Sequence, residues 1–311
     1  MRVLVLGAGS IGRRHHQNLL TLGARAELLP WRTFDAGPAD AALAGLDALV
    51  IATATPIREE IIALCADRGI PFYVEKPLAY RSETLAAILR LAAPVATRSV
   101  AGFMMRYHPA FRHLADSDLA DTFRFGFEIG HDVTQWRQNW QFSQSYAAGA
   151  EGGGVLLDLC HELDMATCLF PGLTLDGVTS LGHTAYPGVD MASQVALTAA
   201  GRATGTVAMD YLAPVSTRRI ALRGLDRLHD FDLIAGSYRV SGAGARTLDL
   251  PFERNEMFLA LMRDFLALVA GRPPSDNAHL PRLDRVGESC ALIARAWESR
   301  RFVGAIGKDI P

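Results

Sequence analysis

The chain has 311 residues, a length that predicts two domains of about 100–200 residues each. Half of the residues are hydrophobic, so each domain can bury an ordinary core. Lys and Arg total 31 against 33 Asp and Glu, and the formal net charge of -2 gives no electrostatic reason to expect nucleic acid or an anionic membrane as a partner.

Three further features of the sequence favour a cytoplasmic protein. No run of about 18 uncharged apolar residues occurs, so we expect no membrane span. The apolar run Val3–Leu6 is too short for a signal peptide. The four cysteines include no Cys-x-x-Cys pair, which indicates reduced thiols.

Strand and helix patterns alternate through roughly the first 115 residues. This alternation predicts an α/β domain of the Rossmann type, with a doubly wound parallel sheet and helices on both faces. The expected strands lie at 2–6, 26–29, 47–52, 71–74 and 100–104, and the expected helices at 10–22, 38–44, 55–68 and 82–92.

The pattern then changes. Phe123, Phe125 and Phe127 alternate with polar or small residues, which is typical of a strand with one exposed face. We expect an α+β domain with a mostly antiparallel sheet, and we divide the chain into residues 1–118 and 119–311. The later strands are expected at 123–129, 174–183, 193–199, 204–210, 218–224 and 228–233, and the helices at 155–169, 255–270 and 283–300.

A glycine motif follows the first strand. In Gly7-x-Gly9-x-x-Gly12, the first glycine allows a tight turn, the second lets the backbone approach a pyrophosphate, and the third lets the helix pack on the strand. The N–H groups of the helix start, at Ser10 and Ile11, carry about half a positive charge towards the phosphates. The motif therefore predicts a dinucleotide site.

The residues after the second strand choose between NAD and NADP. An acid there would bind the adenosine ribose and indicate NAD, but the sequence reads Pro30-Trp31-Arg32-Thr33. Arg32 suits a 2′-phosphate, and Thr33 can donate to it. Glu27 and Asp35 are the alternative acids if the register differs. We expect NADP in preference to NAD.

With Glu75-Lys76-Pro77 directly after the fourth strand of a nucleotide-binding domain, the chain resembles the glucose–fructose oxidoreductase / inositol dehydrogenase / MocA family. Residues 102–109 are similar to the segment by which that family leaves its nucleotide domain, and residues 152–164 to its glycine-rich entry into the catalytic helix. The resemblance covers nearly the whole chain. It implies that residues 119–311 bind the substrate and assemble a homodimer or homotetramer through the open face of the sheet.

Two positions depart from the family. Many relatives place the helix Asp and His four residues apart, whereas Asp158 and His161 are three apart; both spacings keep the side chains on one helical face. Relatives often carry Thr-Pro and then a His near the cofactor, but here Thr53-Ala54-Thr55-Pro56 precedes Arg58. Thr53, Ala54 and Thr55 remain expected cofactor contacts.

The chemistry of these residues suits hydride transfer. Oxidising a secondary alcohol requires removal of the hydroxyl proton, and His161 is the candidate general acid/base. The Lys76 ammonium can hydrogen-bond the reacting oxygen and stabilise its developing negative charge. Glu75 either pairs with Lys76 or contacts the nicotinamide ribose. Asp158 either orients His161 or binds a substrate hydroxyl.

The stripe of Asp158, His161 and Asp164 resembles a metal site. Zinc needs three or four well-aimed ligands, however, and the sequence offers no second cluster, so we expect no metal.

Trp136, Arg137 and Tyr146 precede the glycine run and suit a polyhydroxylated or acidic ligand, because rings stack on sugar faces and guanidinium groups bond hydroxyls or carboxylates. Arg106, in the family-like segment, joins this predicted substrate set. A surface loop anchored by tryptophans is the alternative reading of residues 136–140.

Together these features predict reversible oxidation of a hydroxyl on a sugar, cyclitol or sugar acid, with NADP or NAD as cofactor. Three alternatives stay open: a glycosidase that uses a bound NAD redox cycle, a reductase of an imine or tetrapyrrole, and a non-enzymatic NAD(P)-binding regulator.

Overall fold

A computed structural model describes residues 1–35, 39–135, 141–307 and 310. The chain forms two compact units, residues 1–108 with 253–290 and residues 109–252 with 291–311. This division differs from the single cut expected after residue 118, because a segment near the C-terminus packs with the N-terminal unit.

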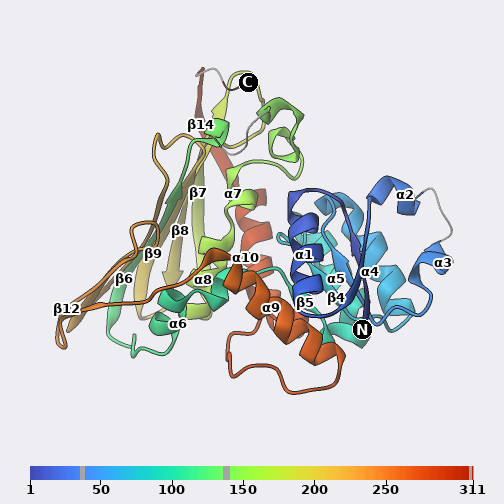
Figure 1. The fold of residues 1–311 in the computed structure, drawn as a ribbon. Coiled ribbons are helices and arrows are strands. Elements are labelled where there is room, and N and C mark those ends of the chain that lie inside the picture. Colours follow the sequence, from blue (N-terminus) through green and yellow to red (C-terminus); the bar gives the residue numbers. More distant parts are fainter. Residues whose placement is uncertain (36–38, 136–140, 308–309, 311) are drawn as a thin grey trace. The chain divides into compact units, whose positions relative to one another are not determined.

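The first unit is built on five parallel strands in the order β2-β1-β3-β4-β5, which confirms the predicted parallel α/β domain (Figure 1). The side chains of β3 and β4 are all buried, and those of β1 are buried after its first residue, as in a parallel sheet covered on both faces. The strands are β1 (Arg2–Leu6), β2 (Arg25–Leu29), β3 (Ala48–Ile51), β4 (Phe72–Val74) and β5 (Val100–Ala101).

Helices connect these strands, and α1 contacts β1, β2 and β3 while α4 packs on α5. A short helix directly after β2 was not expected from the sequence. The helices are α1 (Ser10–Thr21), α2 (Trp31–Asp35), α3 (Ala39–Leu43), α4 (Arg58–Asp67) and α5 (Ser82–Ala92).

Helix α9 (Arg254–Val269) belongs to the first unit, although it follows the second sheet in the chain. The amide side chains of Asn18, on α1, and Asn255 donate to each other at 3.3 and 2.9 Å. The Tyr107 hydroxyl donates to Asp264 at 2.6 Å. The asparagine pair places α9 against α1, and the tyrosine bond joins α9 to the segment that follows β5. These bonds, over a long separation in sequence, explain why one cut does not separate the units.

The strand expected at 100–104 ends at Ala101. Gly102 lies against the Glu75 carboxylate, where an added Cβ would come within 3.1 Å of it. The Phe103 amide donates back to the Ala101 carbonyl at 2.8 Å, and the chain turns into a 3₁₀ helix at Met104–Tyr107. The predicted length was therefore wrong, because β4 offers no partner beyond this point.

The second unit contains nine strands in the order β13-β12-β11-β10-β6-β9-β8-β7-β14. Only the β6–β9 and β7–β14 pairs are parallel among these strands, which confirms the mostly antiparallel sheet. The sequence reading missed β12, β13 and β14. The strands are β6 (Thr122–Gly130), β7 (Leu173–His183), β8 (Ala192–Ala199), β9 (Ala203–Asp210), β10 (Thr217–Gly224), β11 (Arg227–Asp232), β12 (Ser237–Gly242), β13 (Arg246–Leu248) and β14 (Arg300–Ile306).

One face of this sheet is covered by helices. Phe125 and Phe127 are buried on it, and Gly205 of β9 leaves room for the Phe125 ring, since a Cβ there would lie 2.2 Å from that ring. The short helix α7 (Val155–Asp158) contacts β8 and β9, and α8 (His161–Leu169) contacts β6 and β9 (Figure 1). Helix α6 (Pro109–Ala115) packs on α8, and α10 (Gly287–Glu298) precedes β14 in the chain.

The single helix expected at 155–169 is two helices. Leu159 adopts φ -103° and ψ 28°, outside the helical region, so α7 ends at Asp158 and α8 begins at His161. Asp158 and His161 therefore lie on different helices, and the predicted common helical face was wrong.

No helix in the described part of the chain is both long and apolar enough to span a bilayer.

Candidate functional site

The carboxyl edge of the first sheet has the geometry of a ligand site. From β1 the chain moves to β2 on one side, whereas from β3 it moves to β4 on the other, so the strand order reverses between β1 and β3. Leu6 pairs with Ile51, and the loops that follow these two residues therefore start side by side. Ligands of open α/β sheets bind at this point.

The three glycines of the first loop have different surroundings. Gly7 has φ +112°, and a Cβ there would lie 2.4 Å from the Ala52 carbonyl oxygen. A Cβ on Gly12 would lie 1.8 Å from the Gly7 carbonyl oxygen. Gly9 has nothing within 4 Å of its Cβ position. The outer two glycines thus allow close packing, and the middle one leaves the backbone accessible.

Helix α1 starts with its amide groups uncapped. Gly9 at the N-cap makes no side-chain cap bond, the first turn has no acidic residue, and Gly9 and Ser10 are exposed, with Ile11 half-buried. The Thr53 hydroxyl, at the end of β3, is buried and has no hydrogen-bond partner among the described residues. An anion with further hydroxyl or phosphate groups, such as a dinucleotide, fits these donors.

Lys76 stands out in an otherwise buried segment. Every side chain from Ile70 to Ala79 is buried except that of Lys76, which is half-buried. Lys76 follows β4 directly, on the same edge as the glycine loop, and its bond to Pro77 is cis. A cation that emerges from a buried segment at the carboxyl edge is placed to meet a bound ligand.

Glu75 does not point towards solvent. It is 7% exposed, and its Oε1 accepts a hydrogen bond from His15 Nε2 of α1 at 2.7 Å and another from the Tyr73 hydroxyl at 3.4 Å. Burial raises the pKa of Glu75, but the His15 hydrogen bond and the charges of His15, Lys76 and Arg58 outweigh it and bring the pKa below its ordinary value. Glu75 thus ties the end of β4 to α1, and its contact with the cofactor stays a prediction.

This carboxylate makes the stability of the protein depend on pH. A lowered pKa in the folded chain means that the Glu75 carboxylate stabilises the fold above its unfolded pKa of about 4.3, and that this contribution disappears as pH falls through the folded value. We expect Glu75→Gln to have a lower Tm than the wild type at pH 7 and the two Tm values to converge as pH falls below about 4. Thermal unfolding followed by circular dichroism from pH 3 to 8 measures this.

The control for that experiment is Glu60→Gln, which changes an exposed carboxylate on α4. It should shift Tm little at any pH. If the difference in Tm between Glu75→Gln and the wild type is the same at pH 3 and pH 7, the carboxylate charge contributes nothing to stability.

The residue expected to be a His in relatives, Arg58, is 4% exposed. Its guanidinium donates to the Thr53 carbonyl, at 2.8 Å from Nη2, and through Nη1 to the carbonyls of Glu75 and Pro77. Arg58 therefore does not extend into the cofactor edge; it lies beneath it and bonds the two loops that form it. Ala54 is exposed and Thr55 is half-buried in the segment between Thr53 and Arg58.

The end of β2 carries the predicted cofactor-selecting residues. Arg32 and Thr33 are exposed on α2, and the Gly7 amide donates to the Leu29 carbonyl at 2.8 Å, so α2 begins next to the glycine loop. Glu27, the alternative acid, instead pairs at 3.6 Å with Arg2, which lies at the opposite, amino end of the sheet. The side chain of Asp35, the other alternative, lies outside the described residues.

In the second unit, a carboxylate lies between two tyrosines. Asp158 Oδ1 accepts a hydrogen bond from the Tyr146 hydroxyl at 2.5 Å, and Oδ2 accepts one from the Tyr211 hydroxyl at 2.9 Å. Burial, and then the charge of Asp158, hold the pKa of Tyr211 well above its ordinary value, so this hydroxyl stays a donor. Tyr146 is 63% exposed, whereas Asp158 is 8% exposed. His161 follows as the first residue of α8 and is also buried.

The structure thus brings together Asp158 and Tyr146, two of the predicted site residues, and adds Tyr211, which the sequence reading missed. Tyr211 follows β9 and lies more than fifty positions from Asp158 in sequence, so no local pattern could have indicated it.

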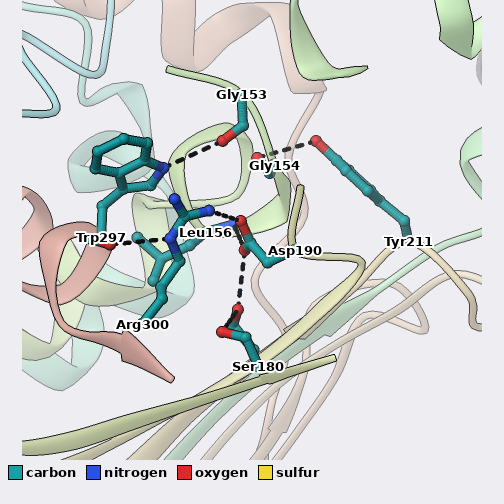
Figure 2. Close-up of polar contacts among 9 residues, drawn as sticks. Gly153, Gly154, Leu156, Ser180, Asp190, Tyr211, Trp297 and Arg300 are labelled. Carbon is teal, nitrogen blue, oxygen red and sulfur yellow. Dashed lines mark hydrogen bonds and ion pairs between the residues drawn. The ribbon is translucent and has the colours of Figure 1, made fainter. Parts of the chain in front are cut away.

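The glycine run before α7 is held by a buried ion pair (Figure 2). Asp190 is fully buried; its Oδ2 accepts the Leu156 amide at 2.9 Å, and its Oδ1 pairs with Arg300 Nη1. Gly154 has φ +93°, and a Cβ there would lie 2.0 Å from Asp190. Trp297 Nε1 donates to the Gly153 carbonyl at 3.3 Å. Residues from two segments that are distant in sequence, around Asp190 and around residues 297–300, therefore fix the chain that leads to Asp158.

Three other site residues were predicted from the sequence: Arg106, Trp136 and Arg137. Arg106 is 4% exposed; its guanidinium donates to Ser289 and to the His279 carbonyl, both at 3.2 Å, so we assign it to packing. Trp136 and Arg137 lie outside the described residues. Within the described ranges, no group of three or more His, Cys, Asp or Glu side chains is placed to hold a metal ion.

Comparison with known proteins adds a family match. Residues 114–226 match the family model of the GFO/IDH/MocA C-terminal domain. The chain is 22% identical over 220 residues to a trans-1,2-dihydrobenzene-1,2-diol dehydrogenase of Xenopus laevis, and the match covers 68% of this chain but only 64% of that protein. It is 23% identical over 283 residues to a UDP-N-acetylglucosamine 3-dehydrogenase of Acidithiobacillus ferrooxidans, covering 86% and 85% of the two chains.

Solved structures share the fold over nearly the full length. The Acidithiobacillus ferrooxidans dehydrogenase superposes with a TM-score of 0.77 at 20% identity, covering 96% of this chain and 97% of that one. A 3-ketoreductase from Actinomadura kijaniata, in complex with NADP and TDP-benzene, also has a TM-score of 0.77, at 17% identity and with 98% and 99% coverage. At these identities the likeness establishes a common fold.

Proposed function

We propose that the chain, whose residues 114–226 match the model of the GFO/IDH/MocA C-terminal domain, is a member of that family and an NADP-dependent oxidoreductase. Its substrate would be a sugar, cyclitol or sugar acid, which would react at a hydroxyl or keto carbon. The observation that carries the proposal is the carboxyl edge of the first sheet, where the uncapped start of α1 and the emerging Lys76 lie on the loops that follow β1 and β4. The relatives named above, two dehydrogenases and a ketoreductase, support a redox reaction over the glycosidase and regulator alternatives.

The residues that would hold the cofactor lie on the loops that follow β1, β2 and β3. The amides of Ser10 and Ile11 would bind the pyrophosphate, with Gly9 allowing its approach. The Thr53 hydroxyl would find its missing partner on the cofactor. Arg32 and Thr33 would bind the 2′-phosphate. When bound, the cofactor supplies or accepts the hydride.

Two side chains would handle the substrate oxygen and its proton. In the direction of oxidation, His161 would take the hydroxyl proton of the substrate. Lys76 would donate a hydrogen bond to a reacting oxygen and stabilise the negative charge that develops on it. In the second unit, the Tyr146 hydroxyl donates to Asp158, so the Tyr146 oxygen and the Asp158 carboxylate would offer acceptors to further substrate hydroxyls. The homodimer or homotetramer expected from the resemblance stays a prediction.

Removing Arg32 tests the choice of cofactor. The loss of a charged hydrogen-bonding partner for the 2′-phosphate should raise the Kd for NADPH by about 10- to 100-fold in Arg32→Ala. NADH lacks that phosphate, and its Kd should stay within about twofold. Titration followed by nicotinamide fluorescence measures both constants. Arg25→Ala, at the exposed opposite end of β2, is the matched control.

Equal losses for NADPH and NADH, or tighter binding of NADH by the wild type, would show that NADP is the wrong cofactor.

A substrate panel tests the reaction itself. The wild type, saturated with the tighter cofactor, is incubated with sugars, cyclitols and sugar acids, and cofactor absorbance and products are followed together. Net cofactor reduction with formation of a keto product is the expected result. Free sugar released without net reduction would indicate the glycosidase, and the absence of turnover across the panel with intact cofactor binding would contradict the proposed activity.

A further inference from the structure

We propose that Arg58 is a positioning residue that fixes the backbone on both sides of Lys76 and couples it to the β3 loop; this rests on the proposed function. Its guanidinium donates to three carbonyls on two loops of the edge: Thr53 after β3, and Glu75 and Pro77 after β4. The Glu75 carbonyl precedes Lys76 in the chain and the Pro77 carbonyl follows it. One planar group therefore determines where the Lys76 backbone lies relative to Thr53.

The local helix gives no reason for an arginine at this place. Arg58 is the first residue of α4, where the helix dipole disfavours a cation. It is also 4% exposed, and a buried cation is costly unless it is fully hydrogen-bonded. Glu59 and Glu60 in the same turn offset part of the unfavourable charge. The three carbonyls accept the hydrogen bonds that a buried guanidinium needs. They explain why an arginine is present at this position.

The number of donors distinguishes Arg58 from the His expected at this place. A guanidinium carries five N–H donors in a rigid plane, whereas an imidazole has two ring nitrogens and cannot donate to three carbonyls. In this chain, Arg58 therefore bonds the backbone of the two loops at the carboxyl edge. Since an error of about 1 Å in the position of a reacting group can cost about 100-fold in rate, loosening this contact should act on Lys76.

Arg58→Lys tests the proposal in the full-length protein. Lysine keeps the charge but replaces the planar fork with a single ammonium on a flexible stem. We expect kcat to fall by about 30- to 100-fold, because Lys76 is no longer held in place. The Kd for NADPH should rise by less than about tenfold and by less than kcat falls, because the phosphates would be bound by Ser10, Ile11 and Arg32, whereas the carbonyls that Arg58 bonds belong to Thr53, Glu75 and Pro77. A primary isotope effect with 4-deuterated NADPH should increase as hydride transfer becomes slower.

The matched control is Arg68→Lys, at the other end of α4. Arg68 is exposed and donates to the Leu64 carbonyl at 3.2 Å within the helix. This variant should leave kcat and the isotope effect unchanged. Arg58→Gln is measured in parallel, since its neutral amide keeps part of the hydrogen bonding and avoids a folding defect caused by a buried ammonium.

A second measurement does not need turnover. Hydrogen exchange, followed by mass spectrometry, should be at least about tenfold faster in residues 74–79 of Arg58→Lys and Arg58→Gln, with the exchange of β1 unchanged. If the wild type turns over no substrate, the proposed function fails while this measurement still tests the role of Arg58. Unchanged exchange in residues 74–79, or a rise in the Kd for NADPH that matches the loss of kcat, would overturn the proposal.

Discussion

Lys76→Met should lower kcat by about 10²- to 10³-fold while the enzyme still binds NADPH, because one preorganised hydrogen-bond donor at a developing oxyanion contributes that much to rate. Methionine has a similar length and preserves the packing of the side-chain stem. Its thioether neither donates a hydrogen bond nor carries charge. The proposed site therefore keeps its shape and loses only the group that stabilises the reacting oxygen.

The composition of the chain makes this lysine informative. Lys76 and Lys308 are its two lysines among 31 basic residues, and the others are arginines. An arginine in place of Lys76 would spread its charge over a plane instead of placing it at one atom. We therefore expect Lys76→Arg to lose nearly as much activity as Lys76→Met.

Single-turnover hydride transfer and NADPH titration separate the two effects. Lys308→Met, at the second lysine, is the matched control and should behave as the wild type does. A kcat for Lys76→Met within about threefold of the wild type would remove Lys76 from the chemistry. A loss confined to the Kd for NADPH would make it a cofactor-binding residue instead.

Arg300→Met should destabilise the second unit by about 3–5 kcal/mol, because it leaves the Asp190 carboxylate buried without its ion-pair partner. The Asp190 side chain is fully buried and that of Arg300 is 8% exposed, so water cannot replace the lost contact. For a unit of this size the expected fall in Tm is roughly 6–20 °C. The guanidinium also stacks on Trp297, with 4.2 Å from its Cζ to the ring centroid, and that contact is lost as well.

A second substitution distinguishes the charge from the packing. In Arg300→Met combined with Asp190→Asn, the buried charge is gone, and we expect part of the lost stability to return. Arg301→Met, the exposed neighbour on β14, is the control and should change Tm little. Differential scanning calorimetry measures all four proteins. A double variant that is less stable than Arg300→Met would show that the unpaired carboxylate is not the cause of the loss.

The ion pair also connects stability to the site. Asp190 holds the Leu156 amide at the start of α7, and α7 ends at Asp158. Loosening the Asp190 anchor should therefore disturb the Tyr146–Asp158–Tyr211 contacts as well as the fold. Reduced activity of Arg300→Met at a temperature where it remains folded would be consistent with this connection.

Much of the first unit could be predicted from local sequence. Near-continuous apolar runs such as Val3–Leu6 and Leu49–Ile51 predict strands of a parallel sheet that is covered on both faces. They contain no alternating polar residues that could form a solvent-exposed face. The glycine spacing has an equally local cause, since Gly7 and Gly12 lie where a Cβ would collide with the backbone. The second sheet was harder: β14 carries exposed side chains with little apolar alternation, and it forms because β7 offers a parallel partner.

The amino-acid sequence by itself determined the parallel sheet, the mostly antiparallel sheet and the positions of the glycine loop and Lys76, because these depend on the size and polarity of residues that are close together in the chain. The tertiary structure alone decided that Glu75 turns inwards to His15, that Arg58 lies beneath the edge, and that Asp158 lies between two tyrosines. A buried polar group must find its hydrogen-bond partner wherever the fold brings one, and that partner can lie anywhere in the chain.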